Sequence, residues 1–314
     1  MIRSVNGVQP RSEKRGGVWK KIVRQRYLIA MIMPAVVILL IFHYFPIYGI
    51  VIAFKNYKPA FGIMNSEWVG FKYFEQFFAN KFSVRIIRNS LLLGVYSFLW
   101  GFPAPILLAL LLNEIRSTRY KRLVQTVTYL PHFISTVIVV GLLKNLMALD
   151  GLVNSITAVF GGTPTVFFSE PEYFRTLYIA SGIWQGVGWG SIIYLAALSG
   201  VDPVLYEAAT IDGANRFKQA LHITIPSIMP TVVILMILNV QGILGSDTQK
   251  ILLMYNTATY ETADTINTYV YREGFENAKY SYSAAVGLMM SLISLVMVLG
   301  MNKLAKTVSE YSLW

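Results

Sequence analysis

Six windows without Asp, Glu, Lys or Arg constrain the fold of this chain most, because each is long enough to cross a lipid bilayer. A crossing helix needs about 20 residues. Backbone amides in lipid must be paired within their own segment, so these windows should be helices rather than open strands. They are continuously apolar instead of alternating, which disfavours a transmembrane barrel. The sequence therefore predicts an all-α membrane protein with six transmembrane helices, at Tyr27–Phe54, Asn89–Asn113, Leu123–Leu143, Thr176–Val201, Ile225–Ser246 and Tyr280–Asn302.

The composition agrees with a membrane protein. Of the 314 residues, 55% are hydrophobic and 14% are charged, against about 25% charged residues in a soluble domain. No cysteine is present, which excludes disulfides, thiolate metal sites and cysteine nucleophiles. Prolines predict bends in the first three windows and at the start of the fifth, at Pro34, Pro46, Pro103, Pro105, Pro131, Pro226 and Pro230.

Basic residues predict the orientation of the helices, since cytoplasmic loops carry an excess of Lys and Arg. Residues 1–26 hold eight Lys or Arg and form a basic tail before the 27–314 membrane domain. The first window is too long for a signal-peptide core and no small-residue cleavage pattern follows it, so it is expected to be an uncleaved anchor. Loops on the tail's side of the membrane hold 16 basic residues in all, and the opposite loops hold nine, besides Lys144 and Arg175 at the outer ends of spans. We expect both termini and the 202–226 loop to be cytoplasmic.

A polar helical hairpin is predicted between the fourth and fifth windows. Asp202 and Pro203 are typical of a helix start, as N-cap and first helical residue. Gly213 follows Asp212 as a C-terminal turn signal, and a second short helix should run from Ala214 to His222. Such a hairpin can let a soluble partner push on the membrane bundle. The alternatives are an ordinary solvated hairpin and a DNA-binding motif, which its few basic residues and flanking spans disfavour.

The hairpin resembles the EAA loop of binding-protein-dependent ABC importer permeases. Its residues Glu207-Ala-Ala-Thr-Ile-Asp212-Gly213-Ala are followed, after nine residues from Gly213, by Ile223-Thr-Ile225-Pro226, with Ile225 where Leu is usual. Other stretches resemble the polysaccharide-type permeases, which include importers for aldouronate, rhamnogalacturonan and alginate fragments. These stretches are Trp68–Phe74, Gly101–Pro105, Leu111–Arg116, Tyr129–Ser135, Trp189–Ala197, Thr265–Arg272 and Ser312–Trp314.

The resemblance implies a type I ABC importer permease, with the MetI-like bundle and a cytoplasmic coupling hairpin at 202–226. It assigns ATPase coupling to Glu207, Ala208, Ala209, Asp212 and Gly213. The implied partners are a second homologous permease, an ABC ATPase dimer, an extracytoplasmic solute-binding protein and membrane lipid, with no nucleic acid. The cargo is expected to be an oligosaccharide, with uronate-containing chains such as alginate fragments favoured, and the location is the bacterial cytoplasmic (inner) membrane.

The energy source is expected to lie outside this chain. It contains no Gly-x-x-x-x-Gly-Lys-Ser/Thr phosphate loop, so we expect ATP and Mg²⁺ to bind to the partner ATPase and this chain to hold no cofactor. No carboxylate lies inside the six windows, and His43 stands alone among apolar neighbours, where a packing role is the simpler interpretation. No catalytic or metal-binding cluster is predicted, so the chain should not be an enzyme. The alternative is an ion-coupled secondary carrier for a small polar solute.

Four side chains in the fourth and fifth windows are candidates for a wet substrate cavity: Trp184, Gln185, Asn239 and Gln241. Amides inside a bilayer need partners, so they either bond across helices or face water. Aromatic faces beside amides suit sugar rings. Gly182, Gly186 and Gly190, at four-residue spacing, predict close helix packing. Lys144 and Arg272 could meet an acidic sugar on the outer side, although snorkelling accounts for them as well.

The outer segment between the first two windows is rich in aromatic residues. At helical spacing, residues from Trp68 to Phe82 predict an apolar stripe on an interfacial helix. Contact with an external binding protein is the alternative.

Overall fold

The computed structural model describes residues 25–308, which divide after Val51 into two compact units. The predicted basic tail 1–26 therefore lies, apart from its last two residues, outside the described range. The first unit is helical: α2 (Arg26–Leu39) with Pro34 inside it, the π-turn η1 (Leu40–Tyr44) and the start of the 3₁₀ segment η2 (Phe45–Phe54). Residues 25–51 contain no buried side chain, as expected of a segment made to face lipid.

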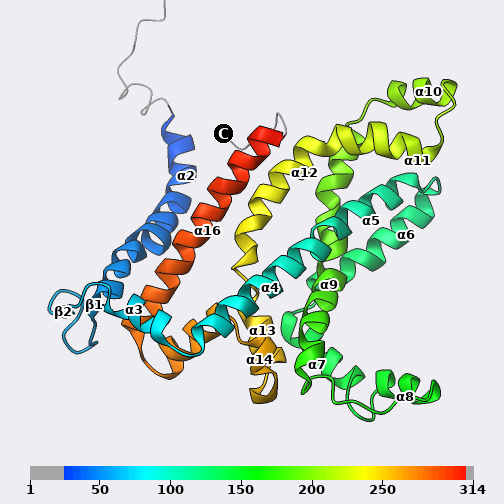
Figure 1. The fold of residues 1–314 in the computed structure, drawn as a ribbon. Coiled ribbons are helices and arrows are strands. Elements are labelled where there is room, and N and C mark those ends of the chain that lie inside the picture. The colour runs from blue at the N-terminus through cyan, green and yellow to red at the C-terminus, as the bar shows by residue number, and fades with distance from the viewer. Residues whose placement is uncertain (1–24, 309–314) are drawn as a thin grey trace, which may run out of the picture. The chain divides into compact units, whose positions relative to one another are not determined.

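The second unit is a helical bundle with one small hairpin of strands (Figure 1). The strands β1 (Lys55–Asn56) and β2 (Glu67–Trp68) pair antiparallel. The remaining elements follow in chain order: α3 (Lys72–Ala79), α4 (Ser83–Gly101), α5 (Pro103–Glu114), α6 (Thr118–Tyr129), η3 (Leu130–Phe133), α7 (Thr136–Leu146), α8 (Leu152–Val159), α9 (Pro171–Ser199), α10 (Pro203–Ile211), α11 (Arg216–Gln219), η4 (Ala220–Thr224), α12 (Ile225–Val240), η5 (Gln241–Ile243), α13 (Thr248–Met254), η6 (Thr257–Thr259), α14 (Tyr260–Ala263), α15 (Ile266–Tyr271), η7 (Arg272–Glu276) and α16 (Tyr280–Val308).

Candidate membrane spans occur at all six predicted places in the described range, four of them as single long helices. Four helices are long and apolar enough to cross a membrane: Arg26–Phe54, Ser83–Glu114, Arg216–Ile243 and Tyr280–Thr307. Two bent pairs raise the number to six when each is counted as one span: Thr118–Phe133 with Thr136–Leu146, and Pro171–Ser199 with Pro203–Ile211. The predicted all-α fold of six transmembrane helices is confirmed, although the third window is not one straight helix.

The third window breaks because of Pro131. Its helix changes to a 3₁₀ turn at Leu130–Phe133, Ile134 is extended, and Ser135 caps a new helix by accepting a hydrogen bond from the Ile138 amide. Proline cannot donate to the helix ladder and crowds the preceding turn. The two halves meet at 101°, so the carbonyl of Ile134 becomes available to other side chains.

Four buried apolar clusters hold the described part of the second unit together, and two of them include residues of α9. Ala109 of α5, Tyr194 of α9 and Ile228 of α12 form one cluster on the side of the hairpin. At Gly188, α9 lies so close to α6 that an added Cβ would stand 2.0 Å from the Thr128 carbonyl oxygen. Of the glycines predicted to pack, Gly190 lies against α5, with Pro105 at 3.0 Å from such a Cβ, and Gly182 lies 3.4 Å by the same measure from the Lys250 ammonium of α13, whereas Gly186 has no neighbour within 4 Å.

The outer aromatic segment differs from the prediction of a single interfacial helix. Trp68 lies in β2, and only Lys72–Ala79 is helical. Phe77 is buried against Ile86 and Tyr269 in a core cluster, whereas Phe71 and Phe78 are exposed. The aromatic residues are therefore divided between the core and the surface. Phe77 belongs to the core because it packs against α15 and α16, which lie nearly 200 residues later in the sequence.

Candidate functional site

The hairpin α10–α11 protrudes at one end of the second unit, and α13 and α14 lie at the other end (Figure 1). Asp202 caps α10, accepting a hydrogen bond from the Val204 amide at 2.9 Å, with Pro203 in the first turn. Gly213 has φ +76°. Its amide bonds the Thr210 carbonyl, and the Ala214 amide bonds the Ala209 carbonyl at 2.8 Å. These two bonds are those of a Schellman motif, in which glycine takes the left-handed position. The predicted start and turn of the hairpin are confirmed.

The second arm of the hairpin runs directly into the fifth span. The short helix α11 continues through the π-turn η4 into α12, so the predicted helix Ala214–His222 begins two residues later, at Arg216, and runs on into the fifth span. Tyr206 and Thr224 share a hydroxyl hydrogen bond of 3.0 Å, and the Gln219 amide donates to the Thr210 hydroxyl at 3.0 Å. The two arms are therefore tied together, and the second arm continues into α12.

The solvent-exposed surface of the hairpin combines charged side chains with exposed apolar ones. Glu207, Ala208, Asp212 and Gly213 are exposed and Ala209 is half-buried. Ile211 is 87% exposed and Phe217 is 76% exposed. Clustered exposed apolar side chains rimmed by polar ones are typical of a protein-binding surface. The small alanines leave room for a close partner.

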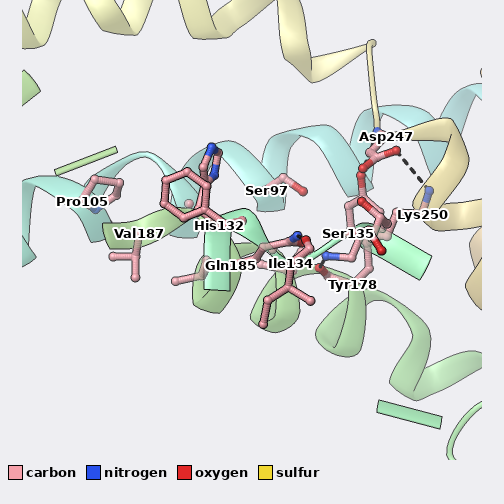
Figure 2. A pocket seen from close by; sticks show the side chains of 17 residues that line it. Ser97, Pro105, His132, Ile134, Ser135, Tyr178, Gln185, Val187, Asp247 and Lys250 are labelled. Atoms are coloured by element: carbon pink, nitrogen blue, oxygen red, sulfur yellow. Dashed lines mark hydrogen bonds between the residues drawn. The ribbon is translucent and has the colours of Figure 1, made fainter. Parts of the chain in front are cut away.

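A cavity of about 720 Å³ lies between α4, α9, η3 and α13. Its lining includes polar groups from each: Ser97, His132, Ser135, Thr136, Gln185, Asp247 and Lys250. Gln185 donates to the Ile134 carbonyl at 2.9 Å, the acceptor that the break in the third span makes available. Figure 2 shows Asp247 and Lys250 at one end of this cavity and Pro105 and His132 toward the other. Such a mixed polar and apolar lining suits a hydroxylated ligand.

The four predicted cavity residues have different positions. Gln185 lines the cavity, together with Gly182 and Gly186, which were expected to pack. Asn239 lines a neighbouring cavity of about 340 Å³ and donates to the Leu235 carbonyl of its own helix. Trp184 and Gln241 line neither cavity. Consecutive helical residues point about 100° apart, so Trp184 cannot share the direction of Gln185.

His132 and Trp189 form a stacked pair beside the cavity. Their rings are 4.6 Å apart and nearly parallel, at 3°. His132 itself lines the cavity, whereas Trp189 does not.

Lys250 is the main functional candidate that sequence reasoning missed. It lies in the first turn of α13, is only 4% exposed, and reaches the cavity. Burial lowers its pKa to about 8, and the negative charge of Asp247 opposes that shift. A sequence signal did exist, since Asp247-Thr-Gln-Lys250 has the pattern of a capped helix start. The cavity itself could not be predicted from the sequence around Lys250. Its other walls come from α4, η3 and α9, which are more than 60 residues from Lys250 in the sequence.

Arg272, in contrast, is not free to meet a ligand as the sequence suggested. Its guanidinium makes two bonds to the buried carboxylate of Asp264, at 3.2 and 2.8 Å. Burial lowers the pKa of Arg272, but the bonds and charge of Asp264 outweigh it and raise the pKa above its ordinary value. This pair fastens the segment between α13 and α16. Among residues 25–308, no cluster of three His, Asp or Glu side chains could hold a metal ion.

A bundle of membrane spans, a braced hairpin at one end and a polar cavity beside a broken span define a polytopic transport protein. The chain belongs to the family of binding-protein-dependent transport system inner membrane components, whose profile matches residues 101–310. It is thus a permease of an ABC importer, as the EAA resemblance predicted, and the alternative of an ion-coupled carrier finds no support.

Relatives match over nearly the whole chain. The polygalacturonan/rhamnogalacturonan transport system permease protein YteP of Bacillus subtilis (strain 168) is 43% identical, over 99% of this chain and 97% of its own. Protein LplB of the same organism is 41% identical, over 93% and 92%. A chain of a bacterial alginate ABC transporter, solved in complex with an alginate pentasaccharide-bound periplasmic protein, superposes with TM-score 0.87 at 40% identity. That match covers 96% of this chain and all of the other, so the MetI-like bundle is confirmed.

Proposed function

We propose that this permease carries oligosaccharides, and uronate-containing ones in particular, from an extracytoplasmic binding protein into the cytoplasm. The observation that carries the proposal is the match, over almost the full chain, to permeases of transporters for polygalacturonan/rhamnogalacturonan and for alginate. All of these glycans contain uronate sugars, which bear carboxylates. The mixed lining of the larger cavity suits such a cargo, because hydroxyl and amide groups can replace the water around a sugar.

The partners follow from the same family. In this proposal a second homologous permease completes the membrane passage, an ABC ATPase dimer binds ATP and Mg²⁺, and a solute-binding protein delivers the cargo at the α13–α14 end. Membrane lipid surrounds the bundle. The chain itself is no enzyme. It lies in the bacterial cytoplasmic membrane with both termini and the α10–α11 hairpin on the cytoplasmic side, where Lys and Arg are enriched.

The hairpin is the proposed ATPase contact. Glu207 supplies a charge for a basic partner side chain, while Ala208 and Ala209 allow close approach. Asp212 and Gly213 form the turn, and the exposed Ile211 and Phe217 add apolar area. Since the arms are bonded to each other and continue into α12, movement of the ATPase dimer is passed to α12, which lines the smaller cavity.

Transport by the assembled importer tests the proposal. The chain is purified with its second permease and ATPase, reconstituted in proteoliposomes, and given the binding protein outside and ATP inside. We expect ATP-dependent uptake of a labelled galacturonic acid trimer, and no uptake by the chain alone. Unaided uptake by the isolated chain would contradict the importer mechanism. Uptake restricted to neutral trimers would contradict the uronate assignment.

A further inference from the structure

Lys250 is a buried cation at the end of the larger cavity. Its ammonium donates to the Tyr178 carbonyl oxygen at 3.1 Å and lies 5.0 Å from the centre of the Tyr178 ring. It also passes close to Gly182, where an added Cβ would be 3.4 Å from Nζ. The side chain is therefore held along α9 rather than extended into solvent.

The backbone behind Lys250 is fixed from two sides. The Asp247 carboxylate accepts a hydrogen bond from the Lys250 amide at 3.0 Å, drawn as the dashed line in Figure 2. The Asp247 amide in turn donates to the Tyr178 hydroxyl at 2.9 Å. Tyr178 thus holds the start of α13 through its hydroxyl and the ammonium through its carbonyl, so the cation has a defined position.

The charge of Lys250 is not balanced by an ion pair within residues 25–308. The ion pairs in that range are Arg216–Glu114, Arg272–Asp264 and Lys279–Glu273. Asp247 is near enough to act on the ammonium electrostatically, but its bonded carboxylate oxygen serves the helix start. A buried charge without a paired partner is costly. An ammonium has three donors, and the Tyr178 carbonyl occupies one, so a ligand in the cavity can take the others.

The rest of the lining indicates what kind of ligand that is. Gln185, Ser135 and Thr136 offer amide and hydroxyl groups along the cavity, which suit the hydroxyls of a sugar. A neutral sugar would leave the ammonium without its counter-charge, whereas a carboxylate on the sugar ring would supply it. Bonds to charged groups are stronger than neutral ones, at roughly 1.5–3 kcal/mol.

We propose that Lys250 binds a carboxylate of the cargo and so makes this permease selective for acidic over neutral oligosaccharides. The inference rests on the proposed function and adds to it the residue that binds the negative charge of the cargo. Asp247 and Tyr178 are positioning residues for Lys250 and make no contact with the cargo in this account.

Three variants of the assembled importer test the assignment. Lys250→Met removes the charge and keeps a long apolar stem, and Lys250→Arg keeps the charge. Lys303→Met is the matched control, because Lys303 is an exposed lysine of α16 outside the cavity lining. Each variant takes up a galacturonic acid trimer and its methyl ester under the same conditions. The binding protein is identical throughout, so its own preference cancels between variants.

The expected result is selective. Lys250→Met should lower uptake of the acid about tenfold or more, the fold-change of about 1.5 kcal/mol or more, and leave uptake of the ester near the wild-type value. Lys250→Arg should restore much of the acid uptake, and Lys303→Met should match the wild type. Equal loss of both cargoes in Lys250→Met would show a merely structural role and overturn the inference, as would unchanged acid uptake. Failure of the wild type to carry the acid would instead overturn the proposed function as well.

Discussion

Gly213 gives the sharpest test of the hairpin, because its turn depends on backbone conformation alone. The residue has φ +76°, and no atom lies within 4 Å of the position that a Cβ would occupy. Replacement by alanine therefore meets no clash. Its effect comes from the left-handed backbone, which costs an L-residue about 1–2 kcal/mol. Asparagine tolerates this conformation better and is the matched control.

A free-energy cost of this size destabilises the Gly213 turn but not the helical bundle. A change of about 1–2 kcal/mol alters the ratio of formed to opened turn by a factor of about 5–30. We expect Gly213→Ala to weaken binding of the purified ATPase to the permease pair and to lower binding-protein-stimulated ATP hydrolysis several-fold. Gly213→Asn should lose much less of the ATPase binding and of the stimulated hydrolysis. The melting temperature of the permease should stay unchanged in both, since the hairpin is exposed.

The assay is ATPase co-purification and stimulated hydrolysis in nanodiscs, with thermal unfolding followed in parallel. Alanine behaving like the wild type would refute the reasoning, because the left-handed position would then not matter to coupling. Equal loss in the alanine and asparagine variants would also contradict it, since it would point to the side chain rather than to the backbone.

Three other expectations follow from the structure. Gly188→Ala should separate α9 from α6 and lower the melting temperature, because its Cβ would stand 2.0 Å from the Thr128 carbonyl oxygen; overpacking costs about 1–3 kcal/mol. Arg272→Met should destabilise by about 3–5 kcal/mol, since it leaves Asp264 buried and unpaired, and adding Asp264→Asn should recover stability in the same thermal assay. Lys250 is protonated below its lowered pKa of about 8, so the KM for an acidic cargo should rise as the outside pH passes 8. In the Lys250→Arg variant the same KM should not change with pH over this range.

The sequence predicted best what depends on neighbouring residues. Six apolar windows gave the spans, since apolarity over about 20 residues is a local property. The capping pattern at Asp202 and the turn at Gly213 also depend on adjacent residues, and both were confirmed. Pro131 predicted a bend, although its 101° break was larger than a proline kink suggests.

What the sequence could not supply depends on segments that meet only in the fold. Whether Gln185 faces a cavity or Trp184 does depends on the rotation of α9 against η3 and α13. Lys250 is buried because Tyr178, 72 positions earlier, covers it. Phe77 is buried because α15 and α16 return to the outer segment. From the sequence, Arg272 could meet a ligand on the outer side, but in the structure it is paired with Asp264.

The central claim, that force enters through the α10–α11 hairpin, is tested most directly by cross-linking. The chain has no native cysteine, so single cysteines can be placed without background. Ile211 and Phe160 are similarly exposed, at 87% and 86%, but Phe160 follows α8, far from the hairpin (Figure 1). In the purified importer, a short cross-linker at Ile211→Cys should capture the ATPase subunit, and the capture should change with ATP. Phe160→Cys should not capture it. Capture from position 160 and none from position 211 would contradict the account.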